Sequence, residues 1–203
     1  MLKCVSSHVT SSHTYFNYLF RFGEGPYYVE FKILVEGMEM YFTVQTAPNE
    51  FMPHSVYTFM QMVDDGVWDN TVFIHHWNHI VQAAPISPDG NTKHDLIAYE
   101  LTFPEYSDEY KHEQYTLGFS SQPGGPEFYI NLMDNINSHG PGQQEHSTVL
   151  NDADPCFAKI VIGKNAFERL RQASADAEST EEIIFTTIEA VRRVTPTQEV
   201  FEA

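Results

Sequence analysis

Residues 115–132 have the sequence YTLGFSSQPGGPEFYINL, in which two short apolar runs flank a turn. The runs 115–119 and 128–132 are rich in aromatic and branched side chains, which indicates two short strands. Between them, Pro123-Gly124-Gly125-Pro126 predicts a rigid turn, because proline fixes its own φ and glycine readily adopts positive φ. A phosphate-binding loop would also need a lysine and a following helix, and this segment has neither.

Alternating apolar and polar residues predict further strands on both sides of this segment. Apolar residues occupy every second position from Val29 to Val35, and a second strand follows a turn at Gly37-Met38. The remaining apolar runs that we interpret as strands are residues 72–82, 96–103, 157–162 and 183–194. About eight short, widely spaced strands favour a closed antiparallel barrel over an open sheet, because closure removes exposed strand edges.

Two helices are expected, one early and one late. Apolar residues recur at helical spacing from Val56 to Val63, shortly after Pro53, which suits the first turn of a helix. A short second helix is expected to be capped by Asn165. The small and acidic residues 173–182 are expected to form a solvated loop.

Composition bounds the class of protein. The chain has 203 residues, with 11 Lys and Arg against 28 Asp and Glu, which gives a formal net charge of −17. This charge repels phosphate and argues against nucleic-acid binding. The 42% hydrophobic content suffices for a packed core.

We expect one domain over residues 27–196, an N-terminal arm over 1–26 and a tail over 197–203. No apolar stretch approaches the roughly 20 residues of a transmembrane helix, so a soluble protein is expected.

The composition of the N-terminal segment allows two interpretations. Residues 1–23 contain no Asp or Glu. They form either a targeting segment for an organelle or secretory lumen, or an arm that packs its aromatic side chains on the domain.

Two cysteines are too few for a disulfide framework. We therefore expect Cys4 and Cys156 to be free thiols, with Cys156 buried in an apolar run.

Short motifs on either side of the 115–132 segment occur in a recognisable order. They are DGVWDNTVF at residues 65–73, VQAA at 81–84 and FAKIVIG at 157–163. This order resembles that of the cyclophilin-type peptidyl-prolyl cis-trans isomerases over residues 28–194. The resemblance implies a mainly β fold, in which two α-helices cap a closed eight-stranded antiparallel barrel. It also implies an apolar proline pocket on the outer face of that barrel.

The resemblance implies an activity in protein folding that needs no cofactor and no covalent step. Amide resonance makes rotation about the peptide bond cost roughly 18–20 kcal/mol. A catalyst must therefore bind the twisted amide better than either planar isomer. In the family, an arginine donates toward the prolyl nitrogen and a glutamine holds the carbonyl side. The implied partner is a proline-containing peptide or protein segment.

Carried over residue by residue, the family's site falls on two catalytic and five substrate-binding positions. His75 stands where the family has its arginine, in an alignment that is one residue shorter before the glutamine, which is Gln82. The substrate-binding positions are Ile80, Phe119, Ser120, Glu127 and Tyr129. Tyr129 replaces the aromatic residue that packs on the proline ring, and Glu127 replaces a second glutamine.

Several departures from the family weaken the expected activity. Histidine lacks the fixed guanidinium fork of arginine and is mostly neutral at neutral pH. Losing one such donor costs about 10²–10³ in rate. The tryptophan and leucine of a later loop have no counterpart in residues 134–154, and a family histidine aligns with Asp154. We predict weak or absent isomerase activity; the alternative is a non-catalytic interaction module or a subunit of a larger assembly.

Two other histidine groups are considered. His75, His76 and His79 invite a metal interpretation. The resemblance places them on a strand and its loop, where residues four apart lie about 13 Å from each other, so no metal is expected. His139 and His146 lie in the loop that replaces the family's tryptophan-bearing segment. That loop is either a solvated insertion or a different rim over the groove that selects a non-standard partner.

Overall fold

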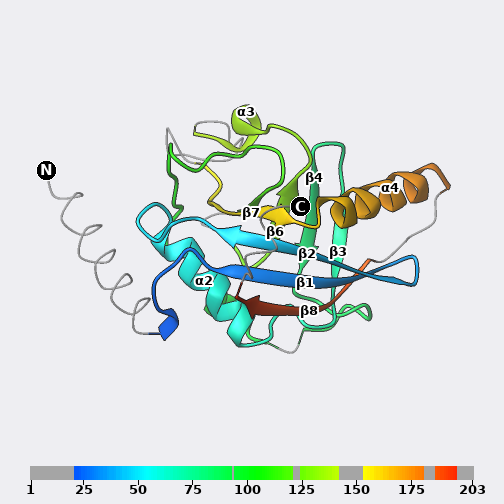
Figure 1. Cartoon of the computed structure of the whole chain (residues 1–203), viewed down its shortest axis with the longest axis horizontal. Helices are drawn as coiled ribbons and strands as arrows, with labels where there is room; N and C mark the ends of the chain where they lie inside the picture. The colour runs from blue at the N-terminus through cyan, green and yellow to red at the C-terminus, as the bar shows by residue number, and fades with distance from the viewer. Residues whose placement is uncertain (1–20, 93, 121–123, 142–152, 181–185, 196–203) are drawn as a thin grey trace, which may run out of the picture.

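A closed antiparallel barrel forms the body of the protein. The computed structural model describes residues 21–92, 94–120, 124–141, 153–180 and 186–195, of which 75, 76 and 173–180 are described by backbone alone. Figure 1 shows the strands, which close in the order β1-β2-β7-β5-β6-β4-β3-β8. Their bounds are β1 (Tyr28–Val35), β2 (Met38–Thr46), β3 (Thr71–His76), β4 (Ile80–Ala84), β5 (Thr116–Phe119), β6 (Phe128–Asn131), β7 (Cys156–Ile162) and β8 (Thr187–Val194). The predicted fold class is confirmed.

Two long helices cover the barrel on different sides (Figure 1). Helix α2 (Pro53–Asp64) begins at a proline, as predicted, and places Phe59 against Phe31 of the barrel interior at a ring separation of 6.4 Å. Helix α4 (Lys164–Thr180) places Phe167 against Phe42 at 6.3 Å. Each helix thus adds aromatic side chains to the core, which is the expected arrangement of two capping helices.

The interior is packed with aromatic rings. Phe31 and Phe42 stack at 4.8 Å across the β1–β2 pair, and Trp68 packs edge-on against Phe128 at 4.6 Å. The predicted alternation in β1 is confirmed, because every second residue from Val29 to Val35 is fully buried. Burial of side chains of this size stabilises the fold by roughly 1.5–3 kcal/mol for each of them.

Several local predictions need correction. The run 72–82 is not one strand, because it is divided between β3 and β4, which pair as a hairpin. The β1–β2 turn is formed by Glu36 and Gly37, with φ angles of 50° and 79°, and Met38 already belongs to β2. Residues 96–103 contain no strand; they include the 3-10 helix η1 (Leu96–Tyr99), whose Ile97 is 75% exposed and so has no sheet to pack on.

The remaining three corrections concern helices. Helix α4 begins at Lys164, so Asn165 lies within it and does not cap it. Its backbone continues to Thr180 through part of the segment expected to be a loop. The polar loop after β6 contains one short helix, α3 (Ile136–His139). The continuation of α4 fits its sequence, because alanine, the residue with the highest helix propensity, stands at positions 173, 175 and 177.

Helix α2 is tied to a distant loop at its first turn. The carboxylate of Glu105 accepts hydrogen bonds from the backbone N–H groups of His54 and Ser55, at 3.1 and 2.8 Å, and from the Ser55 hydroxyl at 2.7 Å. The first turn of a helix leaves such N–H groups without partners inside the helix. Burial raises the pKa of this carboxyl above its ordinary value.

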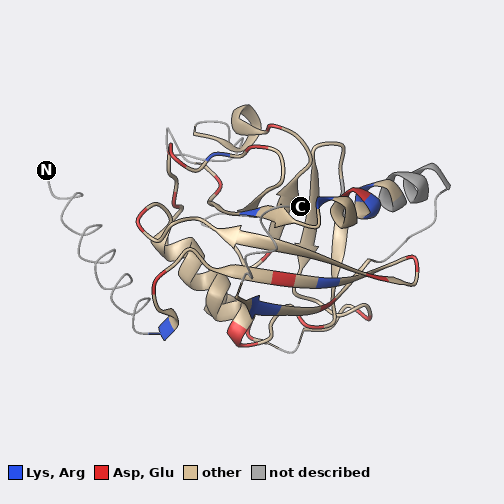
Figure 2. Ribbon diagram, in the orientation of Figure 1, with Lys and Arg blue, Asp and Glu red and all other residues tan. Residues whose placement is uncertain are grey.

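Charged residues lie mainly in loops and on a few strands. Figure 2 shows red segments in many loops and blue segments on β1, β8 and α4. On β8, both guanidinium nitrogens of Arg192 donate to Asp69, at 2.6 and 2.7 Å. Among the described helices, none has the length and apolarity needed to cross a membrane.

Most of the expected N-terminal arm, and Cys4 with it, lies outside the described residues. The part that is described supports packing on the domain, because Phe22 is buried against Tyr27 and Tyr57. Cys156 is a buried free thiol, as predicted. Burial raises its pKa to about 12, which makes the thiol a poor nucleophile.

Candidate functional site

The outer face of β4, β5 and β6 brings the predicted site residues together. Gln82 of β4 lies directly opposite Tyr129 of β6, and Tyr129 in turn lies opposite Gly118 of β5. Val81 and Ala83 join the core cluster inside the barrel, so Ile80 and Gln82 lie on the outer side of β4. This strand pairing creates one patch from three separate sequence motifs.

Gln82, Ser120 and Glu127 form a hydrogen-bonded group at one end of the patch. The side-chain amide of Gln82 donates to Oε2 of Glu127 at 2.5 Å and to Oγ of Ser120 at 3.4 Å. The backbone N–H of Ser120 donates to the carbonyl of Glu127 at 2.8 Å, which fixes the two residues side by side. The amide N–H group of Gln82 therefore points at an internal carboxylate.

Tyr129 is buried beside this group. Its side chain is 2% exposed and crosses Gly118, where an added Cβ atom would lie 2.6 Å from the phenol Cζ and from the hydroxyl oxygen. The hydroxyl donates to Oδ2 of Asp154 at 2.9 Å. Burial and the nearby Asp154 carboxylate raise the pKa of Tyr129 well above its ordinary value, so the phenol stays neutral.

Two histidines enclose the phenol ring. The ring of His139 packs on Tyr129 at 4.6 Å, and its Nδ1 donates to Oδ2 of Asp154 at 2.8 Å. His112 is buried, and its Nε2 donates to the carbonyl oxygen of Asp154 at 2.9 Å. Burial lowers the pKa of His112 to about 4, so this ring is neutral and its Nδ1 can accept a hydrogen bond.

Two buried asparagines fix the chain around these rings. The amide of Asn131 donates to the Thr116 hydroxyl at 3.0 Å, and its oxygen accepts from the amide of Asn135 at 2.7 Å. The amide of Asn135 also donates to the carbonyl of His79 at 2.9 Å. Hydrogen bonds thus join strand β6, the α3 segment and the β3–β4 connection, and the bond between the two asparagines is buried.

Four aromatic side chains form a column that runs from the surface to this buried site. The ring of Trp77 stacks on His79 at 6.4 Å, His79 stacks on His139 at 5.7 Å, and His139 packs on Tyr129 at 4.6 Å. These separations are those of favourable aromatic pairs. We call Trp77, His79, His139 and Tyr129 the ring column. Burial, together with the neighbouring His139, lowers the pKa of His79.

Comparison with known proteins identifies the family. A family model described as cyclophilin type peptidyl-prolyl cis-trans isomerase/CLD matches residues 40–191. The chain belongs to the cyclophilin family. The fold agrees with a crystal structure of a cyclophilin type peptidyl-prolyl cis-trans isomerase of Cryptosporidium parvum, with 18% identity and a TM-score of 0.57 over 84% of this chain and 100% of that one.

A second structure of the Cryptosporidium parvum cyclophilin, determined in the presence of the dipeptide Ala-Pro, gives a TM-score of 0.59 at 18% identity. It covers 83% of this chain and 99% of that chain. No curated protein matches the chain.

The cyclophilin site residues predicted from the sequence fall into three groups. Gln82, Ser120, Glu127 and Tyr129 come together, and Ile80 lies two residues from Gln82 on the same strand face. Phe119 does not join them: it lies in the barrel interior, where its ring stacks on Phe157 at 4.3 Å. The backbone of His75 lies opposite Gln82 after an irregularity in β3, and its side chain lies outside the described part of the structure.

Sequence reasoning missed most of the polar shell around Tyr129 in this cyclophilin. His112, Asn131 and Asn135 were not singled out, because each is an isolated polar residue in an otherwise ordinary segment. His139 and Asp154 were considered, but nothing in the sequence indicated that they would meet. A rim over the groove was one of the two interpretations of the later loop, and the position of His139 supports it. His146, the other histidine named there, lies outside the described residues.

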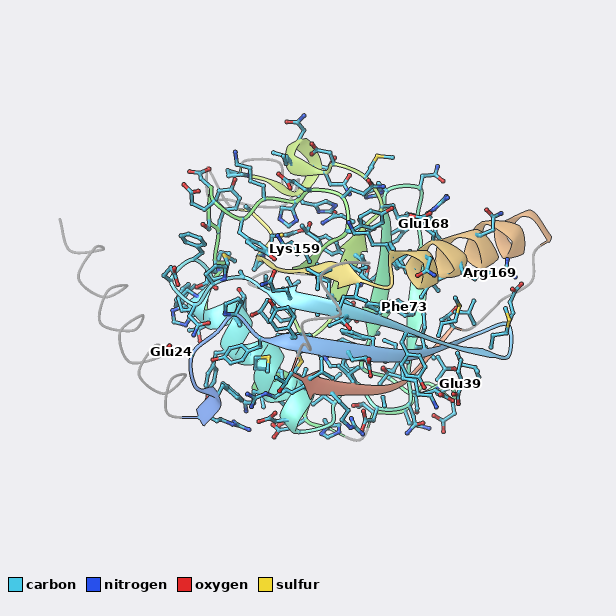
Figure 3. The ribbon with its side chains drawn as sticks, in the orientation of Figure 1. Glu24, Glu39, Phe73, Lys159, Glu168 and Arg169 are labelled. Carbon is cyan, nitrogen blue, oxygen red and sulfur yellow. The ribbon has the colours of Figure 1, made fainter. Side chains whose placement is uncertain are left out.

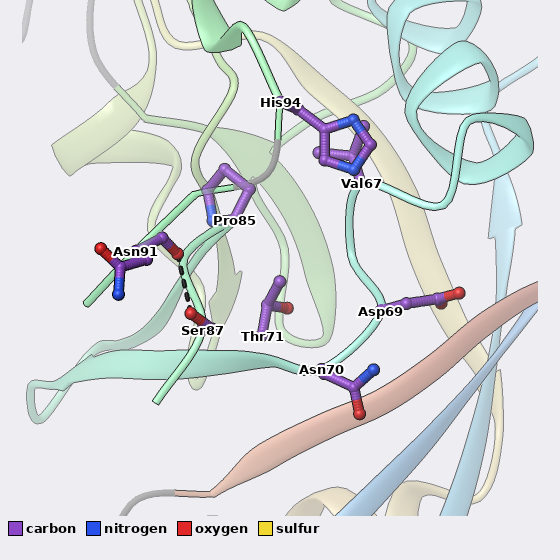
Figure 4. A pocket seen from close by; sticks show the side chains of 8 residues that line it. All are labelled: Val67, Asp69, Asn70, Thr71, Pro85, Ser87, Asn91 and His94. Carbon is purple, nitrogen blue, oxygen red and sulfur yellow. Dashed lines mark hydrogen bonds between the residues drawn. The ribbon is translucent and has the colours of Figure 1, made fainter. Parts of the chain in front are cut away.

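No group of metal-binding side chains is found among the described residues of this cyclophilin. Two hollows are lined by residues other than those of the ring column. One has a volume of about 10 Å³, which suits a single water molecule, and is lined by Ser87, Asn91 and His94 among others (Figure 4). The other, about 250 Å³, is lined by residues of the 108–113 segment, by Thr116 and by Lys159, which is labelled in Figure 3.

Proposed function

We propose that this cyclophilin binds proline-containing segments of proteins and has weak or no isomerase activity. The observation that carries this proposal is the burial of Tyr129 under His139. The family's pocket would offer an aromatic face to the proline ring, whereas His139 lies 4.6 Å from the Tyr129 ring and Asp154 holds both side chains.

Catalysis in such a pocket would require His139 to leave. Its departure would break a hydrogen bond to a carboxylate, which contributes about 1.5–3 kcal/mol, and would expose the Tyr129 ring. That energy would be subtracted from the binding energy available for the twisted amide. A bound transition state would therefore be stabilised less than in an open pocket.

The state of Gln82 supports the same proposal. In the family a glutamine holds the carbonyl side of the substrate, whereas here its amide donates to Glu127 at 2.5 Å. A substrate carbonyl would have to compete with a charged acceptor, and hydrogen bonds to charged acceptors are the stronger ones.

The test is the rate of isomerisation of a short Ala-Pro peptide, compared with an ordinary cyclophilin under the same conditions. We expect kcat/KM to be lower by at least about 10²-fold, the loss expected for one missing charged donor. A value within tenfold of the ordinary enzyme would contradict the proposal. Binding of proline peptides is measured separately by titration, so the two halves of the proposal are tested independently.

The alternative is a module that never acts on its partner. The substitution His75→Arg, which restores the charged donor, discriminates between a weak isomerase and a non-catalytic module. If the groove is otherwise competent, kcat/KM for isomerisation should rise by a large factor. A gain of less than about threefold, with proline-peptide binding retained, would favour the non-catalytic module.

A further inference from the structure

The ring column ends at the surface in a large exposed aromatic residue. Trp77 lies in the connection between β3 and β4 and is 47% exposed, whereas Tyr129 at the other end is 2% exposed. The site that would receive a proline ring in the family is thus covered. The aromatic surface that solvent can reach lies at the opposite end of the same stack.

We propose that Trp77 is the docking platform for proline, in an extended and positively charged segment of a partner protein. This inference rests on the proposed function, since it places proline binding on this face of the barrel. It moves the contact from Tyr129 to the outer end of the ring column.

The position of Trp77 is fixed before any partner arrives. Its backbone N–H donates to the carbonyl of Ile80 at 2.9 Å, and its ring stacks on His79 at an interplanar angle of 21°. A ring that is already held in place loses little conformational freedom on binding. Proline-rich segments are preformed as extended helices and dock on exposed aromatic rings in the same way.

A second apolar side chain lies on an adjoining segment. Met133 is 49% exposed, and the neighbouring Leu132 donates its N–H to the carbonyl of His79 at 2.8 Å. The chain segments that carry Trp77 and Met133 are therefore held together at His79. A flexible thioether on this adjoining segment suits the irregular apolar surface of a peptide.

Charge selects the kind of partner. Residues 72–158, which run from β3 to β7 and include the ring column, contain 12 Asp and Glu, two Lys and no Arg. This part of the chain thus contributes −10 of the net charge of −17. Asp134, next to Met133, is exposed. Charges of one sign on this scale attract segments of the opposite sign and repel acidic ones. The partner segment therefore carries Lys or Arg beside its proline.

The experiment titrates the full chain with the peptide Gly-Lys-Ala-Pro-Arg-Gly and follows tryptophan fluorescence and heat of binding. Trp68 is fully buried, so a change in emission reports on Trp77. We expect Trp77→Ala to weaken binding by about tenfold and Trp77→Phe by less than about threefold, because phenylalanine keeps an aromatic face. Binding should also weaken as salt rises from about 0.05 to about 0.5 M.

The matched control is Met38→Ala, which removes a side chain of similar exposure, 50%, from the first residue of β2. It should leave binding unchanged. Peptides with Ala in place of Pro, or Glu in place of Lys and Arg, should bind at least about tenfold more weakly. Equal urea midpoints of all variants show that the fold is retained.

Three results would overturn the inference. If Trp77→Ala binds the peptide as the wild type does, while a variant of Tyr129 or Gln82 does not, the proline sits in the family's pocket and only the proposed function stands. If the wild type binds neither the proline peptide nor its alanine version, the proposed function fails as well. If Trp77→Ala instead abolishes a concentration-dependent dimer seen by light scattering, the platform serves a second copy of the chain.

Discussion

The hydroxyl of Tyr129 donates to the carboxylate of Asp154 at 2.9 Å, across 25 residues of sequence. The same carboxylate oxygen accepts from His139 at 2.8 Å, so one acid holds both rings of the covered pocket. The packing of His139 on Tyr129 therefore depends on Asp154.

Removing the imidazole should reopen the pocket. In a His75→Arg background, which restores the missing donor, His139→Ala is expected to raise kcat/KM on an Ala-Pro peptide by at least about tenfold over His75→Arg alone. The control is His94→Ala at the small hollow of Figure 4, away from the ring column. No gain from His139→Ala would mean that the imidazole does not obstruct the pocket.

Tyr129 packs so closely over residue 118 that only glycine fits there. Gly118→Ala would place a Cβ atom 2.6 Å from the phenol, and we expect a loss of about 1–3 kcal/mol in the free energy of unfolding. Urea unfolding measures it. In a Tyr129→Leu background the same change should cost less, because the phenol is gone. Equal costs in both backgrounds would show that the glycine is needed for another reason.

Acid should destabilise the protein through His112. Its pKa is lowered by burial from 6.5 to about 4, so the unfolded chain binds a proton in this interval that the folded chain does not. The stability that neutral His112 provides is present above pH 6.5 and is lost as pH falls toward 4.

The expected size of this loss is about 3 kcal/mol. Urea unfolding of the wild type and of His112→Gln, across that pH range, isolates it from the other titrating groups. The difference in unfolding free energy should shrink as pH falls and stay constant above about pH 7. A constant difference at all pH values would contradict a neutral buried ring.

Glu105 should be important for helix α2. Glu105→Ala removes the acceptor of two N–H groups and of the Ser55 hydroxyl, and we expect a loss of about 1–3 kcal/mol in unfolding free energy. Glu109→Ala, at an exposed position in the same region of sequence, should change it by less than about 0.5 kcal/mol. Similar effects of the two substitutions would argue against the cap.

The barrel could be predicted because its signals are local. The alternation in β1 and the apolar stripe of α2 each depend on residues within a few positions, and both are confirmed. Their order along the chain then indicated the family. The strand predicted at residues 96–103 was wrong because the short apolar run at its start, which forms η1, fits a strand or a helical turn equally well.

The site was predictable only in part. Gln82, Ser120 and Glu127 lie in matching motifs, so the resemblance brought them together correctly. The contact between His139 and Tyr129 depends on how the loop after β6 returns to the barrel. That path is set by the asparagine hydrogen bonds around Asn131 and Asn135, which leave no periodic pattern in the sequence. Phe119 was expected at the substrate-binding face but lies in the barrel interior, because a motif match does not say on which side of a strand a residue lies.

The buried thiol of Cys156 supplies a natural reporter for motion near the site. Its Sγ donates to the carbonyl of Lys111, one residue before His112, at 3.3 Å. An alkylating reagent can reach this sulfur only when the segment that holds His112 lifts from β7. After Cys4→Ser, the chain has a single thiol, so its labelling rate in native buffer counts those openings directly. Partner peptides that close or loosen the ring column would change that rate without any engineered probe.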